Sequence, residues 1–213
     1  MAVRFALLLL LALLTNNTVA QIKAVTGTGD EVVLYENHTW KYINKSDTES
    51  HEIQTNRISF EKKSNATFQV SSNIVDNANI YIDPKKWKFK KSDGSSVYEF
   101  FFTSAKKDAY GMFIGEKTQM PVTSLREIAL QYATKVAPDI HVLKEEYRTV
   151  NGIQVLEMDM QGTVQGIDVT YMNYYFSSTR GTIQFDTFTG TAQFKDSKAD
   201  MEELLNGLVI TLK

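Results

Sequence analysis

The sequence predicts an α+β protein in which an antiparallel β-sheet is flanked by helices and preceded by a small β-hairpin. Residues 151–190 have the pattern of three consecutive strands separated by glycine-bearing turns. Two segments, within 121–138 and near 197–206, change to the helical spacing of apolar residues. Hydrophobic residues make up 43% of the chain and cysteine is absent, so a buried core rather than disulfides must stabilise it.

Residues 1–20 have the layout of a secretory signal peptide. Arg4 precedes an apolar run at residues 5–14, which is shorter than the roughly 20 residues that a membrane span needs. Small residues before Gln21 offer a cleavage site, and an uncleaved anchor is the alternative. We therefore expect a periplasmic or extracellular protein without a transmembrane segment after cleavage. Without a cysteine there is no lipobox for a lipid anchor.

Residues 21–43 are expected to form the N-terminal hairpin. Apolar residues alternate with a period of two on both sides of a turn at 36–39, namely Val32, Leu34, Trp40 and Tyr42. The piece resembles a short element that follows the signal peptide in secreted proteins of Gram-negative bacteria. Asn37-His38 stands where that element has Asp-Gly.

Residues 44–65 are polar and are interpreted as a linker, so the main domain is expected over 66–213. Its first half should contain short strands near Phe68–Val70 and over 78–82, the latter ended by Asp83-Pro84. The segment 97–102 is apolar on both faces and therefore predicts a central strand. We expect 109–116 to be its antiparallel neighbour.

The segment 121–138 predicts the first helix of the domain. Its apolar residues recur at helical spacing, and Ser124 and Glu127 have the spacing of a capping box, which places the helix start near Ser124. Pro138 is expected to close it.

The second half of the domain should hold a strand over 140–149, the three strands of 151–190 and a last helix. In the first of those three strands Leu156, Met158 and Met160 alternate with polar residues, which predicts one buried and one solvated face. The last helix is expected over about 197–206, capped by Asp196 or Ser197, with Gly207 at the C′ position and an apolar tail over 208–212.

The order of these elements, together with the Pro84-Lys85-Lys86-Trp87 segment that follows the strand at 80–82, resembles the PsbP-like family over about residues 66–213. The resemblance implies an α/β/α sandwich, an antiparallel sheet with helices packed on its faces. It also implies a secreted, non-catalytic module, and it transfers no metal or partner residues.

The sequence contains no recognisable signature of a metal, cofactor or nucleic-acid site. His38, His51 and His141 lie far apart, so we expect no zinc site and no cofactor. A net charge of −2 with both signs well mixed argues against nucleic acid as a partner.

Two groups of residues remain as candidates for a site. Glu157 and Asp159 share one strand face about 7 Å apart, a separation that glycoside hydrolysis could use, although a solvated strand face explains them equally well. Tyr171, Tyr174 and Tyr175 belong to a dense aromatic set that either packs in the core or lines a groove for a ligand. We expect that groove on the sheet face opposite Leu156.

The function that the sequence favours is a secreted or periplasmic binding or assembly module without catalysis. Its partner would be a protein or a small ligand, and the oligomeric state is left open. A hydrolase of envelope or extracellular polymers, resting on Glu157 and Asp159, and a structural surface component are the alternatives.

Overall fold

The computed structural model describes residues 22–25, 31–34, 40–42 and 53–211. The chain divides into two compact units, Met1–Ser50 and His51–Lys213. The expected signal peptide lies outside the described residues.

The first unit contains a three-stranded antiparallel sheet in the order β1-β2-β3. Its strands are β1 (Ile22–Val25), β2 (Glu31–Leu34) and β3 (Trp40–Tyr42). The pairing of β2 with β3 confirms the predicted hairpin, and β1 adds a strand to it. The predicted turn at 36–39 is outside the described residues.

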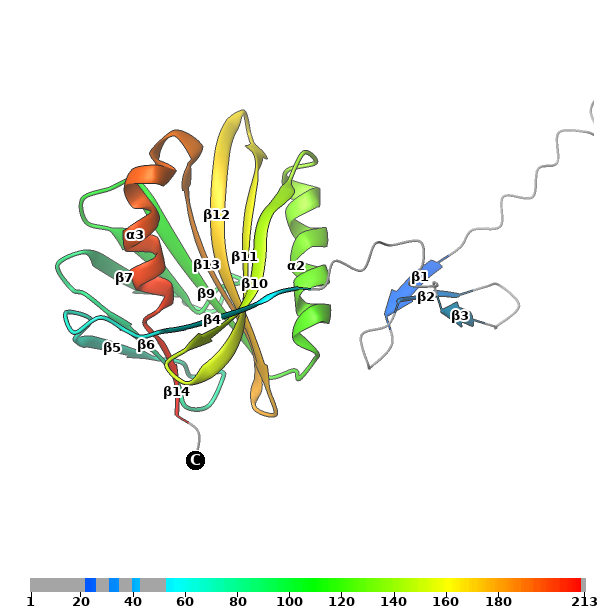
Figure 1. The fold of residues 1–213 in the computed structure, drawn as a ribbon, viewed down its shortest axis with the longest axis horizontal. Coiled ribbons are helices and arrows are strands. Elements are labelled where there is room, and N and C mark those ends of the chain that lie inside the picture. The colour runs from blue at the N-terminus through cyan, green and yellow to red at the C-terminus, as the bar shows by residue number, and fades with distance from the viewer. Residues whose placement is uncertain (1–21, 26–30, 35–39, 43–52, 212–213) are drawn as a thin grey trace, which may run out of the picture. The chain divides into compact units, whose positions relative to one another are not determined.

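The second unit is built on an eight-stranded sheet in the order β4-β10-β11-β12-β13-β9-β8-β7 (Figure 1). Every neighbouring pair is antiparallel except β4 and β10, which are parallel. The strands are β4 (Thr55–Phe60), β7 (Trp87–Lys91), β8 (Phe100–Ser104), β9 (Ala109–Glu116), β10 (His141–Val150), β11 (Ile153–Val164), β12 (Ile167–Ser178) and β13 (Gly181–Gly190). As predicted, β8 is interior and β9 is its neighbour, although β8 begins at Phe100 rather than at residue 97.

The expected linker at 44–65 contains strand β4, so this prediction is wrong for residues 55–60. β4 forms the edge of the large sheet and pairs with β10, and the second unit begins at His51 instead of residue 66. An edge strand that faces solvent needs few apolar side chains, which is why its composition resembled that of a linker. Only Phe60 of this strand packs against the core, as a partly buried residue.

The two helices cover opposite faces of the large sheet (Figure 1). α2 (Val122–Val136) packs through Leu125 and Ala129 on the face that carries Leu156 and Met158. α3 (Phe194–Leu205) follows a 3-10 turn, η1 (Thr191–Gln193). The predicted α/β/α layering is confirmed.

A three-stranded antiparallel sheet in the order β14-β6-β5 packs in the same hydrophobic core as α3. It consists of β5 (Phe68–Ser71), β6 (Ala78–Ile82) and β14 (Leu208–Ile210), which confirms both predicted early strands and the packed tail. Val70, Ile80 and Leu208 lie in one cluster with Met201 and Leu204 of α3.

The prediction that β11 has one solvated face is wrong. Glu157 is 0% exposed and Asp159 is 5% exposed, because α3 and the small sheet cover the face on which they lie, whereas α2 covers the Leu156 face. In β11 the alternation of apolar and acidic residues therefore reflects two buried faces, one apolar and one acidic.

Both predicted helix caps are also wrong. α2 begins at Val122 behind Pro121, so Ser124 lies inside the first turn, buried, and its Oγ has no hydrogen-bond partner among the described residues. Glu127 instead pairs with Arg126. α3 begins three residues before Ser197, and no side chain caps either helix.

Gly207 follows Asn206 at the end of α3, as expected, but its φ is not positive. Its backbone lies directly against β6: the Tyr81 amide donates to the Gly207 carbonyl at 2.8 Å. A Cβ at position 207 would collide with the Tyr81 carbonyl oxygen. Close approach, rather than a left-handed conformation, therefore requires glycine here.

Gly207→Ala should lower the free energy of unfolding by about 1–3 kcal/mol, because the collision is with backbone and β14 must shift away from β6. Gly190→Ala is the matched control. Its Cβ would meet only the end of the exposed Gln193 side chain, so it should cost less than about 0.5 kcal/mol. Urea unfolding of both variants measures the difference, and equal losses would contradict this account.

Candidate functional site

A cavity of about 490 Å³ lies between α2 and the large sheet. Its floor consists of side chains from β9, β12 and β13, and α2 forms one wall. Apolar side chains provide most of the lining, among them Met112, Ile114 and Met160. This size and composition are those of pockets for small organic ligands.

The sequence of α2 explains why the cavity exists. Ala129 and Ala133 of α2, and Ala137 directly after it, recur every fourth residue and line the cavity, and each of these positions contributes only a methyl group. Tyr132 and Val136 also line it, yet each is 63% exposed. Leu130 and Ala133 still pack against the core of this face, so the cavity lies beside the second half of α2, next to Tyr132.

The floor of the cavity carries a polar group of residues from two neighbouring strands. Tyr171, Asn173 and Tyr175 come from β12, and Gln184 and Asp186 come from β13. Antiparallel pairing places Asn173 directly opposite Asp186, and Tyr175 opposite Gln184. The period of two along each strand directs all five to the cavity.

Two oxygens on this floor have no partner within the described residues. Asn173 is 2% exposed, and its Nδ2 donates to the Tyr175 hydroxyl at 3.2 Å while its Oδ1 accepts nothing. Asp186 is half-buried as a residue, but its Oδ1 is enclosed and also accepts nothing. Burial raises the pKa of Asp186 to about 7.

The structure separates the three candidate tyrosines. Tyr171 and Tyr175 line the cavity. Tyr174 points to the other face, where its hydroxyl donates to Asn206 Oδ1 at 2.8 Å and accepts from Arg148 at 3.3 Å. Successive residues of a strand alternate between faces, so Tyr174 belongs to the core beneath α3.

The prediction that the groove lies on the sheet face opposite Leu156 is wrong. The register pairs Leu156 with Tyr175 and Met160 with Tyr171, and cross-strand partners share a face. The tyrosines and Leu156 are therefore on the same side of the sheet, and α2 covers only the part of that side nearest Leu156.

A half-buried aromatic surface continues from the cavity floor across β13, β9 and β8. The rings of Tyr171 and Phe188 are 5.8 Å apart, those of Phe188 and Tyr110 5.4 Å, and those of Tyr110 and Phe101 6.1 Å. Three further aromatic residues of β12 and β13 lie in the core on the α3 side, namely Tyr174, Phe176 and Phe185. The set thus divides between core and cavity.

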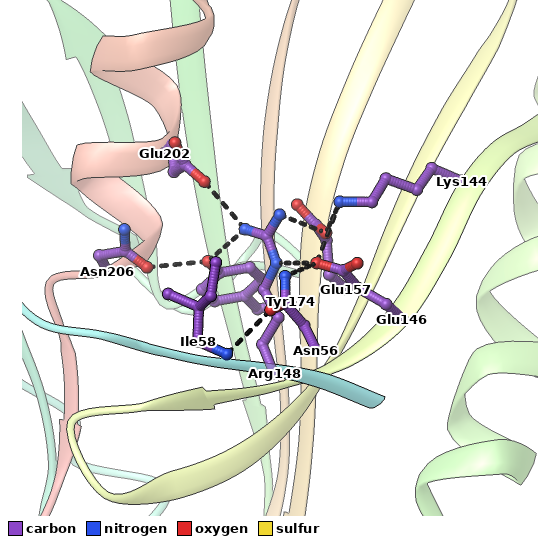
Figure 2. A network of polar contacts seen from close by, with 9 residues as sticks. All are labelled: Asn56, Ile58, Lys144, Glu146, Arg148, Glu157, Tyr174, Glu202 and Asn206. Atoms are coloured by element: carbon purple, nitrogen blue, oxygen red, sulfur yellow. Dashed lines mark hydrogen bonds and ion pairs between the residues drawn. The ribbon is translucent and has the colours of Figure 1, made fainter. Parts of the chain in front are cut away.

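Glu157 and Asp159 do not line the cavity. They lie on the opposite face of β11, beneath α3, and Glu157 belongs to the network of polar contacts that Figure 2 shows. Lys144 Nζ is 3.0 Å from Glu157 Oε2. The structure places no catalytic pair at an accessible site here, and the observation that motivated a hydrolase loses its support.

Arg148 is the centre of this network, and it is 6% exposed. Its guanidinium contacts Glu157 Oε2 at 2.8 Å, Glu202 Oε1 at 2.9 Å and Glu146 Oε1 at 2.5 Å. The flat face of the group lies 4.3 Å from the centroid of the Phe60 ring. One side chain of β10 therefore joins β4, β11 and α3.

The carboxylates of the network have different pKa values. Burial, and then the neighbouring Asp159, raise the pKa of Glu157 to about 7 against the opposing effect of Arg148 and Lys144. Burial also acts on Glu146, but hydrogen bonds from Asn56 and the same two cations prevail and lower its pKa to about 2.

Within the part of the chain that the structure describes, no cluster of three His, Cys, Asp or Glu residues could hold a metal ion. His141 is exposed, and His38 and His51 are outside the described residues. A search of those same residues finds no helix with the length and hydropathy of a membrane span.

Sequence reasoning missed Asn173 and Asp186, and it missed the alanines of α2. The sequence did contain an indication of the site. Asp186 is an acidic residue between Phe185 and Thr187 of a strand, two positions before Phe188 and therefore on the same face as that aromatic residue. Without the register of β12 against β13, the sequence could not show that Asn173 lies opposite it.

Comparison with known proteins supports the fold. No family model matches the chain, and no curated protein matches it. The solution structure of cyanobacterial PsbP (CyanoP) from Synechocystis sp. PCC 6803 matches 68% of this chain and 92% of its own with a TM-score of 0.50 at 13% identity. LpqN of Mycobacterium tuberculosis, described as involved in cell envelope biogenesis, matches 68% and 90% with a TM-score of 0.44 at 11% identity. The chain has a PsbP-like fold, as its sequence predicted.

Asp186→Asn should stabilise the protein in a pH-dependent manner. A raised pKa means that the ionised carboxyl destabilises the fold, a cost that is absent below the ordinary value of 3.8 and complete above about 7. We expect Asp186→Asn to raise the free energy of unfolding by about 1–3 kcal/mol at pH 8, and this gain should disappear towards pH 4. Urea unfolding across this range measures it, with exposed Asp76→Asn as the control. A gain of equal size at both ends would contradict the assignment.

Arg148→Met should lower the free energy of unfolding by about 3–5 kcal/mol, because it leaves buried carboxylates uncompensated. The exposed Arg57→Met on β4 is the control and should change it by less than about 0.5 kcal/mol. A double-mutant cycle with Glu157→Gln should show a coupling of about 1–3 kcal/mol. Additive losses would mean that the ion pair is not the cause.

Proposed function

We propose that this protein is an exported, non-catalytic module that binds a small, largely apolar ligand in the cavity between α2 and the sheet. The observation that carries the proposal is the pair of enclosed oxygens, on Asn173 and Asp186, at the floor of an otherwise apolar cavity. Export is supported by the pattern of residues 1–20, and the PsbP-like fold is compatible with such a module.

The enclosed oxygens favour a binding role because buried polar groups in folded proteins are nearly always hydrogen-bonded. An acceptor left without a donor costs about 1–3 kcal/mol. The fold could have avoided that cost with an apolar residue at either position, as it does at the neighbouring Met112 and Ile114. Because these oxygens are enclosed, a ligand that brings donors to the floor recovers the loss once the side chains around them shift to admit it.

The non-catalytic part of the proposal rests on the placement of the acidic residues. Glu157 and Asp159 are buried beneath α3, and Glu157 is paired with Arg148 and Lys144. On the cavity floor, the Asp186 carboxyl lies beside amide and phenol groups, which suit recognition through hydrogen bonds.

Ala133→Trp should abolish binding, because the indole would occupy the space that the small α2 side chains leave open. The probe is 2-(1-naphthyl)ethanol, a neutral molecule with an apolar body and one hydroxyl. Titration followed by ¹H–¹⁵N NMR should shift the amide signals of β12 and β13 around residues 171–175 and 184–186.

Gln131→Trp is the matched control, since residue 131 is on the same helix, exposed and outside the cavity lining. It should leave the shifts unchanged. Binding that survives Ala133→Trp, or shifts confined to other parts of the domain, would refute the cavity as the binding site. Failure of any probe to bind would favour a structural surface component.

A further inference from the structure

We infer that the ligand carries a positively charged amino group, which the cavity holds between the Asp186 carboxylate and its tyrosine rings. The inference rests on the proposed function and specifies its ligand class: an organic cation with an apolar body.

The charges around the cavity have one sign. Glu116 and Asp186 line it, and no Lys, Arg or His is found among the described residues of the lining. Of the two cations of α2, Arg126 pairs with Glu127 and, at 2.7 Å, with Glu145, whereas Lys135 lies over the exposed ring of Tyr132. A cavity with carboxylates and no internal cation favours a positively charged guest and disfavours an anion.

Three tyrosines line the same cavity, Tyr132 from α2 and Tyr171 and Tyr175 from β12. Aromatic faces attract ammonium groups through the negative face of the ring, more strongly where water is excluded. The ring of Tyr132 already attracts a cation of the protein itself, since Lys135 Nζ lies 4.8 Å from the ring centroid. The rings thus extend the attraction of Asp186 over the walls.

The hydrogen-bonding capacity of the floor matches an ammonium group. The groups without partners, Asn173 Oδ1 and Asp186 Oδ1, are both acceptors. An ammonium supplies three donors and no acceptor, a hydroxyl supplies one donor, and a carboxylate supplies none. A bond from a cation to a carboxylate is also stronger than one between neutral groups.

The remainder of the lining selects the body of the ligand. Met112, Ile114 and Met160 provide flexible apolar contacts, and the alanines of α2 leave room for a ring system. The half-buried rings of Phe188 and Tyr110 continue this surface from Tyr171. An arylalkylamine fits these requirements in size and in polarity.

Isothermal titration calorimetry of the full domain with three probes of equal shape tests the inference. The probes are 2-(1-naphthyl)ethylamine, 2-(1-naphthyl)ethanol and 1-naphthylacetic acid, at pH 8. We expect the amine to bind at least about tenfold more tightly than the alcohol and the acid to bind most weakly. Asp186→Asn should weaken binding of the amine about tenfold and remove most of the difference in affinity between the amine and the alcohol.

Glu116→Gln, at the exposed rim, should weaken binding of the amine less than Asp186→Asn does. Asp76→Asn should leave the affinity for the amine unchanged. Near-ultraviolet circular dichroism verifies that each variant is folded. Because the three probes are first compared on the unaltered protein, the test does not depend on any variant.

The outcomes separate the two proposals. If the alcohol or the acid binds as tightly as the amine, or if Asp186→Asn weakens all three equally, the cavity binds ligands but not organic cations, and only this inference fails. If no probe binds, the proposed function fails with it.

Discussion

The guanidinium of Arg148 lies buried where β4, β10, β11, β12 and α3 meet, and it must be satisfied there because an unpaired buried charge costs several kcal/mol. Glu157 and Glu202 supply that pairing from β11 and α3, and Tyr174 adds a hydrogen bond from β12. Phe60 closes the site from the edge strand. These contacts fix how α3 lies on the sheet, so one face of the domain is dedicated to holding it together.

The opposite face has a different organisation, and this difference suggests where function resides. There α2 packs on the sheet through Leu125 and Ala129, and the cavity lies between the sheet and its second half. Enclosed oxygens without partners occur on both faces, on Glu157 and Asp159 beneath α3 and on Asn173 and Asp186 under α2. Only the second pair of residues lines the cavity. A single sheet therefore separates the polar network around Arg148 from the proposed binding cavity, and the adjacent residues Tyr174 and Tyr175 belong to one each.

The layered fold and most strands follow from local patterns, because period-two and helical spacing are properties of short segments. Three features do not. β4 is an edge strand whose polar sequence carries no burial signal, and the start of α2 is set by Pro121 instead of Ser124. The cavity depends on cross-strand register, since the opposition of Asn173 and Asp186 joins residues thirteen positions apart. Tyr171 and Tyr175 were predictable as candidates because aromatic density is visible in sequence.

We propose that Asp186 at the cavity floor recognises an ammonium group. Intermolecular nuclear Overhauser effects between 2-(1-naphthyl)ethylamine and the ¹³C-labelled protein test it directly. We expect contacts from the methylene beside the amino group to the rings of Tyr171 and Tyr175, and from the naphthyl ring to Ala133 and Val136 on the α2 side of the cavity. The reverse orientation, with the naphthyl ring at Asp186, or contacts only on the α3 face would contradict it.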